Sequence, residues 1–375
     1  MKPKAITDVL IIGAGPTGLM LACLCAQRGL TCRVLESRTA PGQHSRSIGI
    51  HPPSLELFDH IGVIHDLLKA GTRIQQGIAS VGKRQVGVIN FDTLPGRYPF
   101  VLTVSQAITE TLLEHRLQEL LGDVIDRGVT VKAVRADDSV ATVETNTGTE
   151  FAAHWVVGCD GKRSVCRESI GMGGTARLYP DQYVMGDFVD PSRSRSQALI
   201  FLCREGLIES FPHSQNLRRW VVHLGMTPSD APSEGHIREV IRQRVGEDIS
   251  GECVMLSRFQ PDYFLADTFV RGRCLLAGDA AHVLSPIGGQ GMNLGWLDAA
   301  AAVEAISRGD DTALQAYDAV RRARFVRAAK QAEFNMRRGR PFRSEEVQIL
   351  LVRLLLSPLL HNRLRDRFTM QGLAG

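Results

Sequence analysis

The chain has 375 residues, of which 44% are hydrophobic and 22% charged. This composition is typical of globular proteins and excludes a disordered chain, a collagen-like chain and a disulfide-stapled miniprotein, while the length predicts one large domain or two interleaved ones. The net charge of 44 − 40 = +4 is too small to favour nucleic acid, so no nucleic acid partner is expected.

The eight cysteines are scattered and include no C-x-x-C pair. Neither a zinc site nor a redox dithiol is therefore indicated, and no metal is expected. Reduced, buried cysteines favour a cytoplasmic protein. Asp8 interrupts the first apolar run, so no signal peptide is predicted, and no uncharged apolar stretch reaches the roughly 18 residues of a membrane-spanning helix.

The first predicted unit is a strand, a glycine-rich turn, a helix and a second strand. The apolar run 9–12 predicts a buried strand, and Gly13-Ala14-Gly15-Pro16-Thr17-Gly18 leads into a helix over 19–29 and a strand over 31–35. The three glycines permit a tight turn, close approach of a pyrophosphate, and close packing of helix on strand. Glu36 lies 36 − 13 = 23 positions after the first glycine, where a carboxylate can bind ribose hydroxyls. The unit predicts dinucleotide binding without choosing between FAD and NAD.

The segments that follow predict two helices and a hairpin. Apolar residues at helical spacing predict one amphipathic helix over 54–69. Two β-rich runs within 77–91 flank Gly82-Lys83-Arg84, which is typical of a hairpin. A further helix over 107–121 begins after Gln106.

Two later strand ends carry an aspartate beside a glycine. One run ends at Asp160-Gly161 before a short helix over 165–170, and a second ends at Gly278-Asp279 before Pro286, Gly288-Gly289-Gln290-Gly291-Met292-Asn293 and a helix that reaches residue 306. An aspartate there can hold a ribose or ribityl hydroxyl. The N–H groups that open the last helix can face a flat, electron-accepting ring, because the helix dipole stabilises negative charge. These two motifs favour FAD.

The region between these motifs predicts a mostly antiparallel sheet that forms one wall of a substrate cleft. Its strands are expected over 183–189, 198–202, 207–211 and 220–224, with a helix over 233–245. Candidate wall residues are Tyr183, Phe201, Phe211, His213 and Trp220, although Phe and Trp on strands are often core residues. His213, Arg218 and Arg219 are candidates to polarise a phenol or bind a carboxylate, or else to cap a solvated loop.

Residues 344–368 predict one or two C-terminal helices. Three roles are open for these helices: packing on the body of the protein, forming a dimer face, or weak contact with a membrane surface. The last role is considered because leucines beside arginines suit an anionic interface. The chain is expected to be a monomer or a homodimer.

Three motifs together resemble those of the single-component FAD-dependent aromatic hydroxylases, the class A flavoprotein monooxygenases of the para-hydroxybenzoate hydroxylase type. They are GAGPTGL from residue 13, CDGKRS from residue 159, and GDAAH…P…GGQGMN from residue 278. The resemblance covers about residues 6–340. This resemblance implies an α/β protein with a discontinuous Rossmann-like FAD-binding domain (1–75, 100–176 and 270–340). An inserted, mostly antiparallel β-sheet substrate domain (76–99 and 177–269) and C-terminal helices (341–375) complete the expected architecture.

The resemblance also assigns roles to residues of this sequence. The FAD pyrophosphate is expected at Gly13, Gly15 and Gly18, with Pro16 and Thr17 in the same turn, and the adenosine ribose at Glu36, beside Ser37. Arg46 and Gln106 match residues that lie near the cofactor, and Asp160 belongs to a motif associated with both FAD and the pyridine nucleotide. Asp279, beside Gly278, is expected at the ribityl chain, Pro286 beside the reactive flavin carbon, and Gly289, Gly291, Met292 and Asn293 at the flavin ring.

The implied reaction is an NAD(P)H- and O₂-dependent hydroxylation of a phenol, polyketide, quinolone or quinone-like ring through a flavin hydroperoxide. No side chain is a firm catalytic residue because the flavin carries the chemistry; the candidates are Arg46, Pro286, His213 and Tyr183, and His282 is expected to be structural. An FAD-dependent dehydrogenase or reductase of a lipid-like or isoprenoid substrate is the alternative. A flavin-binding partner protein without turnover is disfavoured, since a dead site has no chemical need for Glu36, Asp160 and Asp279.

Overall fold

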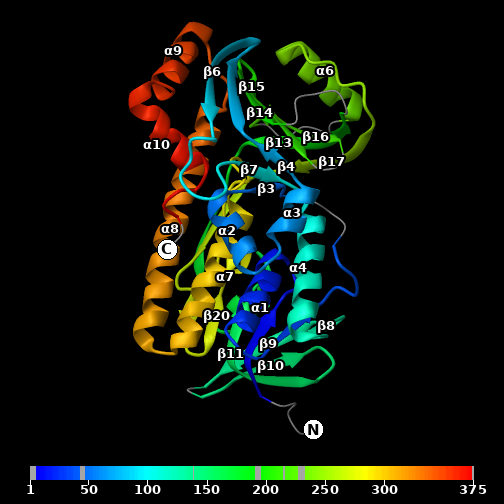
Figure 1. Cartoon of the computed structure of the whole chain (residues 1–375), viewed down its shortest axis with the longest axis vertical. Helices are drawn as coiled ribbons and strands as arrows, with labels where there is room; N and C mark the ends of the chain where they lie inside the picture. Colours follow the sequence, from blue (N-terminus) through cyan, green and yellow to red (C-terminus); the bar gives the residue numbers. More distant parts are fainter. Residues whose placement is uncertain are drawn as a thin grey trace.

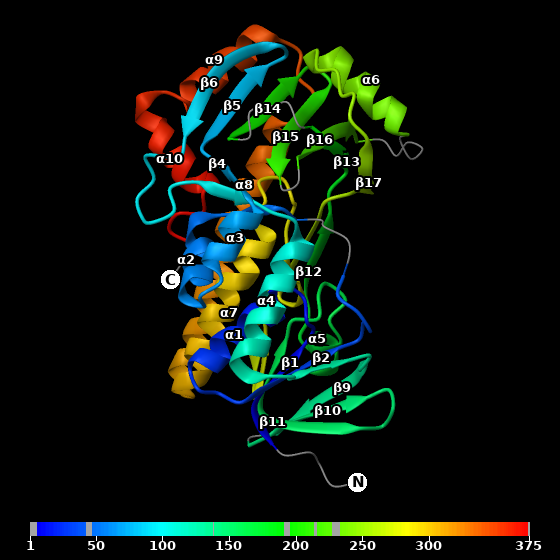
Figure 2. The same ribbon diagram turned by 45° about the vertical axis from the view of Figure 1, so that its right-hand side comes forward.

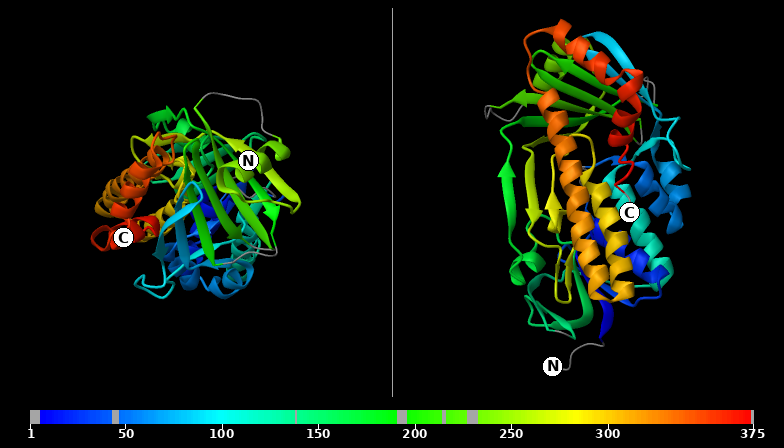
Figure 3. Two further views of the ribbon diagram at one scale, coloured as in Figure 1. Left: turned by 90° about the horizontal axis from the view of Figure 1, so that it is seen from above. Right: turned by 90° about the vertical axis from the view of Figure 1, so that its left-hand side faces the viewer.

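The structure is a computed structural model of the chain, and it describes residues 6–42, 47–137, 139–190, 196–213, 216–226 and 233–373. The molecule is elongated, with a large β-sheet toward each end of its long axis (Figure 1). Helix α8 (Asp311–Arg338) runs along this axis and connects the two ends, as the right-hand view of Figure 3 shows.

Within the described residues, eight strands form the first sheet, in the order β19–β20–β11–β1–β2–β8 with β10 and β9 attached beside β11. Its central strand β1 is buried on both faces, because Val9, Leu10 and Ile11 are at most 1% exposed. The strands are β1 (Thr7–Ile12), β2 (Cys32–Glu36), β8 (Ile125–Arg127), β9 (Val131–Ala136), β10 (Ala141–Thr145), β11 (Glu150–Gly158), β19 (Val270–Arg271) and β20 (Cys274–Leu276).

Parallel pairing brings the carboxyl ends of strands from distant parts of the chain to one edge of this sheet. Ile12 of β1 pairs with Leu35 of β2 and with Gly158 of β11, and Gly158 pairs with Leu276 of β20. The segments that follow these four strands therefore meet, as expected for the crevice beyond the carboxyl ends of a parallel sheet.

Helices cover the first sheet. α1 (Pro16–Gln27) packs against α4 (Gln106–Leu121) and α7 (Gly291–Arg308), and the short α5 (Val165–Ser169) follows β11. The prediction of one helix over 54–69 is wrong, because the segment forms α2 (Pro52–His60) and α3 (Ile64–Ala70). Gly62, between them, has a φ of +80°, which no α-helix accommodates.

The second sheet has seven strands among the described residues, in the order β17–β13–β16–β15–β14–β5–β6, and all its pairings except that of β14 with β5 are antiparallel. The mostly antiparallel sheet and the hairpin of β5 and β6 agree with the sequence-based expectation. The strands are β5 (Gln76–Val81), β6 (Arg84–Asn90), β13 (Gln182–Val189), β14 (Gln197–Cys203), β15 (Gly206–His213), β16 (Leu217–Gly225) and β17 (Cys253–Phe259).

The two faces of the second sheet have different neighbours, since successive side chains of a strand point to opposite faces. One face packs Phe201 and Trp220 under α6 (Glu234–Val245), which Figure 2 shows beside the sheet. The opposite face, here called the inner face, carries Tyr183, Met185, Leu207 and Val221. It packs against Ile287, from the loop before α7, and Met336 of α8.

Two small sheets and two helices complete the fold. The small sheets are β3 (Gly49–Ile50), β7 (Val101–Thr103) and β4 (Thr72–Ile74), and β12 (Gly174–Leu178), β18 (Asp262–Ala266) and β21 (His282–Val283); η1 (Gly278–Ala280) precedes β21. The C-terminal helices are α9 (Glu345–Leu355), which contacts β5 and β6, and α10 (Pro358–Phe368). Among the described residues no single helix could cross a membrane; α9 and α10 pass that test only as a pair, and they are bent by 83°.

Candidate functional site

The turn between β1 and α1 is closely packed at two of its glycines and open at the third. Gly13 has a φ of +103°, and a Cβ there would lie 2.6 Å from the carbonyl oxygen of Cys159. A Cβ at Gly18 would overlap the carbonyl oxygen of Gly13. At Gly15, by contrast, a Cβ would meet nothing within 4 Å. The turn thus holds the helix close to the strand and leaves free space beside Gly15.

Two helix N-termini open toward this edge without a capping side chain. The N-cap of α1 is Gly15 and that of α7 is Gln290, and neither helix has a side-chain cap hydrogen bond or an acidic residue in its first turn. The two helices approach closely, because a Cβ at Gly278 or Gly295 would collide with the hydroxyl of Thr17. Uncapped N–H groups and the positive end of each helix dipole favour an anion or an electron-rich ring.

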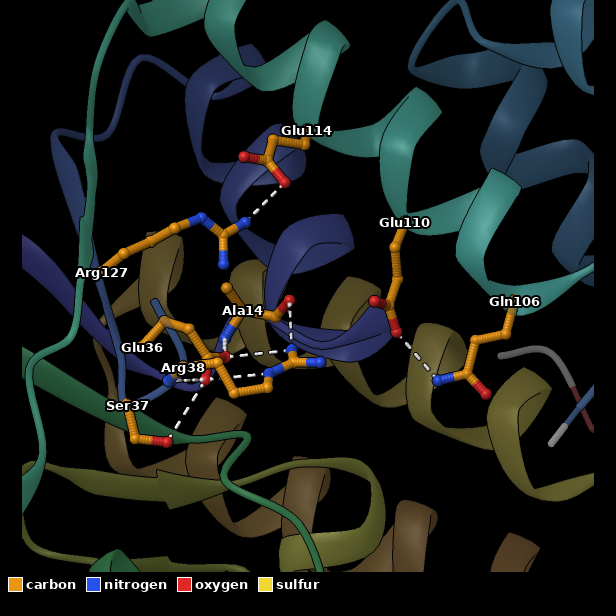
Figure 4. Close-up of polar contacts among 8 residues, drawn as sticks. All are labelled: Ala14, Glu36, Ser37, Arg38, Gln106, Glu110, Glu114 and Arg127. Atoms are coloured by element: carbon orange, nitrogen blue, oxygen red, sulfur yellow. Dashed lines mark hydrogen bonds and ion pairs between the residues drawn. The ribbon is translucent and has the colours of Figure 1, made fainter. Parts of the chain in front are cut away.

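Glu36, at the end of β2, binds back to the glycine turn (Figure 4). Its Oε2 accepts a 2.8 Å hydrogen bond from the N–H of Ala14, and its Oε1 accepts hydrogen bonds from the backbone N–H and Nε of Arg38. Burial acts to raise the pKa of Glu36, but the hydrogen bonds from Arg38 and Ala14 outweigh it and lower the pKa. The site therefore presents an ionised carboxylate with an arginine beside it; the hydroxyl of Ser37 lies 3.3 Å from the same carboxylate.

A second acidic group lies on α4 near the same turn. Gln106 donates a 2.8 Å hydrogen bond to Glu110 (Figure 4), and the N–H of Ser47 lies 3.5 Å from the side-chain oxygen of Gln106. Burial raises the pKa of Glu110 more than Gln106 and Arg38 lower it. Arg46 lies outside the described residues, so the structure gives no position for it.

Asp160, after β11, binds the first turn of the helix that follows it, whose N-cap is Ser164. Its Oδ2 accepts a 3.1 Å hydrogen bond from the N–H of Cys166 in α5, while its Oδ1 is buried without a partner in the part of the chain that the structure describes. Burial raises the pKa of Asp160 above its ordinary value, against hydrogen bonds from Ser164 and Cys166. One oxygen is thus structural, and the other lacks a partner among the described residues.

The segment after β20 is fixed by a buried carboxylate on α7. Asp298 accepts hydrogen bonds from the N–H of Gly278 (3.0 Å) and Nε of Arg321 (2.7 Å), and Nε2 of His282 lies 2.6 Å from it. Burial acts to raise the pKa of Asp298, but His282 and Arg321 outweigh it and lower the pKa to about 2. His282 is therefore a partner in a structural ion cluster, whereas Asp279, next to Gly278, is exposed.

The loop from Pro286 to Asn293 forms the last side of the site. The N–H of Gly289 donates to the carbonyl of Pro286, and the side-chain amide of Asn293 donates to the carbonyls of Gly289 and Gly49. Its carbonyl oxygen accepts from the N–H of His51. Pro286 is exposed; Gly291 and Met292 open α7 and are half-buried.

His51 is an orphaned group beside this loop. The residue is 5% exposed, and neither ring nitrogen has a hydrogen-bond partner among the described residues. Burial lowers the pKa of His51 to about 4, and the backbone of Gly288 and Gly289 opposes this only in part. The ring is therefore neutral near pH 7.

The candidate wall residues of the second sheet divide between its two faces. Phe201 and Trp220 stack on each other, with ring centroids 6.5 Å apart, in the core under α6. Of the two alternatives for these residues, core or substrate wall, the structure thus supports the core. Tyr183 lies on the inner face, fully buried and stacked on Phe259 with centroids 5.3 Å apart. Phe211 shares that face, since it pairs with Arg219 two residues from Val221.

The charged wall candidates are already engaged. Asp187 accepts hydrogen bonds of 2.6 and 2.7 Å from Arg219, and His213 Nε2 lies 3.4 Å from the same carboxylate. Burial acts to raise the pKa of Asp187, but Arg219 and His213 outweigh it and lower the pKa. Arg218 points to the other face, where it binds Asp190 and Ser210. Neither arginine is an unpaired binding group for a substrate carboxylate.

A family model described as "FAD binding domain" matches residues 6–332. The chain belongs to this FAD-binding family. A rifampicin monooxygenase from Streptomyces venezuelae is 32% identical over 300 residues, which are 78% of this chain and 62% of that protein. The chain thus spans less than two thirds of the length of this curated relative.

Solved structures agree with the family on the fold. The p-nitrophenol 4-monooxygenase PnpA from Pseudomonas putida superposes with a TM-score of 0.86 at 23% identity, over 97% of this chain and 98% of that one. The anhydrotetracycline hydroxylase OxyS from Streptomyces rimosus superposes with a TM-score of 0.79 at 27% identity, over 98% of this chain and 76% of that one. The fold is a mixed α/β fold of the FAD-binding type.

The residues present fit FAD. The space beside Gly15 and the uncapped start of α1 suit a pyrophosphate, and the orphaned ring nitrogens of His51 lie beside the loop expected at the flavin ring. Arg38, His51 and Asp298 were not predicted from the sequence. Arg38 stands two positions after Glu36, the acid expected at the adenosine ribose, and this spacing is the signal that could have identified it.

Proposed function

We propose that this chain is an FAD-dependent monooxygenase that uses NAD(P)H and O₂ to hydroxylate an aromatic small molecule such as a phenol, polyketide, quinolone or quinone. The observation that carries the proposal is the meeting of four strand ends at one sheet edge, in a member of the FAD-binding family. Relatives named for the monooxygenation of rifampicin and the hydroxylation of anhydrotetracycline support it.

The chain's own residues would bind and orient the cofactor. FAD supplies the electron transfer and oxygen chemistry when bound. We infer that Gly13, Gly15 and Gly18, together with the N-terminus of α1, hold the pyrophosphate, with Pro16 and Thr17 shaping the turn. Glu36 and Arg38 hold the adenosine ribose, the exposed Asp279 holds the ribityl chain, and the backbone of Gly289, Gly291, Met292 and Asn293 faces the flavin ring. Gln106 and the unpaired oxygen of Asp160 remain proposed cofactor contacts.

The inner face would form the substrate side of the site. It packs against Ile287, one residue from Pro286, which supports a substrate position between the inner face and the loop before α7. The apolar side chains of this face exclude water from the reacting ring. Pro286, Tyr183 and His213 stay candidates for contact with the substrate.

We infer further that the cofactor domain is Rossmann-like and discontinuous, comprising 1–75, 100–176 and 270–340. The substrate sheet (76–99 and 177–269) would be inserted in it, and the C-terminal helices occupy 341–375. The pairing of β5 with β14, and of β6 with β5, supports this division. A cytoplasmic protein is expected, since all eight cysteines are free. A monomer or a homodimer is expected as its oligomeric state. Exposed Leu350, Leu354 and Leu359 on α9 and α10 support a weak membrane-surface contact.

The test is to purify the chain, measure retained FAD by its visible spectrum, and follow NADH and NADPH oxidation and O₂ uptake with and without phenols. Substrate-stimulated O₂ uptake with a product heavier by one oxygen atom is the expected result. Reduction of a lipid-like substrate without oxygen incorporation would instead identify the dehydrogenase or reductase alternative. A chain that retains no FAD and cannot be reconstituted with it refutes both.

A further inference from the structure

Strand β15 places a glutamate among apolar side chains of the inner face. Glu209 is 7% exposed, and it pairs across the sheet with Val221 of β16 and Ile200 of β14. Both neighbours belong to the apolar cluster that contains Ile287 and Met336. In the part of the chain that the structure describes, the carboxyl group of Glu209 has neither a hydrogen bond nor an ion pair.

An unpaired carboxyl group in such a place is costly. Buried acidic side chains in proteins are nearly always paired or hydrogen-bonded, because an apolar environment penalises the charged form. Burial raises the pKa of Glu209 to about 7, and no neighbouring group opposes this. No described residue compensates the cost, so a structural role does not account for Glu209. Groups of this kind cluster at functional sites.

A second unpaired polar atom lies on the same face. The hydroxyl of Tyr183 is buried without a partner among the described residues. Burial raises the pKa of Tyr183, and the charges of Asp181 and Glu209 add to the effect. Tyr183 on β13 and Glu209 on β15 lie on the two sides of β16, where they pair with His223 and Val221.

The other charged groups of the inner face are paired with one another. Asp187 binds Arg219 and lies beside His213 at one end of the sheet. Asp181 binds Arg340 and lies 3.2 Å from His223 at the other end. Among the described residues, Glu209 and the Tyr183 hydroxyl are thus polar groups of this face that a ligand can satisfy without breaking an ion pair.

We propose that Glu209 is the specificity residue that accepts a hydrogen bond from a hydroxyl group on the aromatic substrate, with the hydroxyl of Tyr183 as a second polar contact on the same face. The proposal rests on the proposed function, because it takes the inner face as the substrate side of the flavin site. A carboxyl group that is half ionised near pH 7 accepts such a hydrogen bond strongly, and a hydrogen bond to a charged group discriminates by about tenfold or more. An aromatic ring without the hydroxyl would leave Glu209 buried and unpaired.

The experiment compares two probes that differ only in the donor, 2-naphthol and its methyl ether, 2-methoxynaphthalene. Their affinities for the FAD-loaded protein are measured by titration calorimetry for the wild type, Glu209→Gln, Glu209→Leu and the control Glu205→Gln, which alters an exposed glutamate on the β14–β15 turn. Retained FAD is measured first, so that cofactor binding is scored separately. The affinity ratio is then repeated from about pH 5 to about pH 8 for the wild type and Glu209→Gln.

The wild type and Glu205→Gln are expected to bind the naphthol about tenfold more tightly than the ether, and Glu209→Leu to bind both alike. The preference grows as pH rises through the titration of Glu209 and is independent of pH in Glu209→Gln, which keeps the result interpretable if the leucine variant fails to fold. A wild type that binds both probes equally or neither, or a preference that survives in both Glu209 variants, overturns the proposal. A wild type that shows the preference but does not couple NAD(P)H oxidation to oxygen incorporation overturns the proposed function and leaves the recognition role standing.

Discussion

Replacing Glu209 by glutamine should change how the stability of the protein depends on pH. Glu209 is 7% exposed and its carboxyl group has no partner among the described residues, and burial raises its pKa from the ordinary 4.5 to about 7 in the folded chain. Between these values the folded state binds the proton more tightly than the unfolded state does. The free energy of unfolding of the wild type therefore falls as pH rises through this window, and it is lowest above the folded-state pKa.

The magnitude follows from the two pKa values. Each pH unit between them corresponds to about 1.4 kcal/mol, so a rise from 4.5 to about 7 corresponds to about 3 kcal/mol. Most of this, about 2 to 3 kcal/mol, is lost between about pH 5 and about pH 8. With an unfolding entropy of about 2.1 cal/mol/K per residue, a chain of 375 residues converts it to a difference of about 3 °C in melting temperature.

The assay is thermal unfolding of the wild type, Glu209→Gln and the control Glu205→Gln at about pH 5 and at about pH 8. The melting temperature of Glu209→Gln relative to the wild type should increase by about 3 °C from the lower to the higher pH, because the amide does not titrate. Glu205→Gln should show no such change, since its side chain is exposed. If the two glutamine variants respond to pH alike, Glu209 is not a desolvated carboxyl group and the reasoning about the inner face is wrong.

Three further results are expected. Burial lowers the pKa of His51 from 6.5 to about 4, so the free energy of unfolding is highest above pH 6.5 and falls as pH drops toward about 4. His51→Gln should remove about 3 kcal/mol of this loss, measured by unfolding at about pH 4 and about pH 7. Gly18→Ala should lower both FAD retention and the melting temperature of the FAD-free chain, because its Cβ would collide with the carbonyl of Gly13. Gly15→Ala should lower FAD retention alone, because its Cβ meets no atom of the described residues within 4 Å. Equal melting temperatures for the two FAD-free variants would contradict this. Asp298→Asn should cost about 3 to 5 kcal/mol in unfolding experiments and weaken FAD retention, since a buried ion cluster loses its central charge; an unchanged melting temperature would refute its role.

The glycine turn and the strand ends could be predicted from the sequence because local physics determines them. The buried run before Gly13 and the spacing to Glu36 are typical of a parallel βαβ unit, and the structure contains that unit. The break in the helix over 54–69 could not be recognised from apolar spacing, because Gly62 interrupts the helix without interrupting the pattern.

The wall of the site was harder to predict, because it depends on which face of the second sheet each residue joins. Shifting a strand by one residue exchanges its two faces. Phe201 and Trp220 therefore lie in the core under α6, while Glu209 lies on the inner face without having been identified as a candidate. Along β15, Leu207, Glu209 and Phe211 alternate with other residues and so lie on one face of the sheet. Only the strand pairing shows that this face is the inner face.

Interactions between distant segments could not be derived from the sequence alone. Asp298 joins Gly278, His282 and Arg321, and the aspartate and arginine lie on two different helices. Nothing in the motif around Gly278 indicates which carboxylate fixes it. The structural role of His282 was expected, but its partners became apparent only from the packing of α7 on α8.

The central claim is that three distant motifs form one FAD site, and hydrogen exchange with and without FAD tests it most directly. Amide exchange read by mass spectrometry should slow on FAD addition in residues 13–18, around Asp160 and in residues 278–293, all with the same dependence on FAD concentration. Slowing confined to the first glycine turn, or different FAD dependences for the three segments, would contradict the claim.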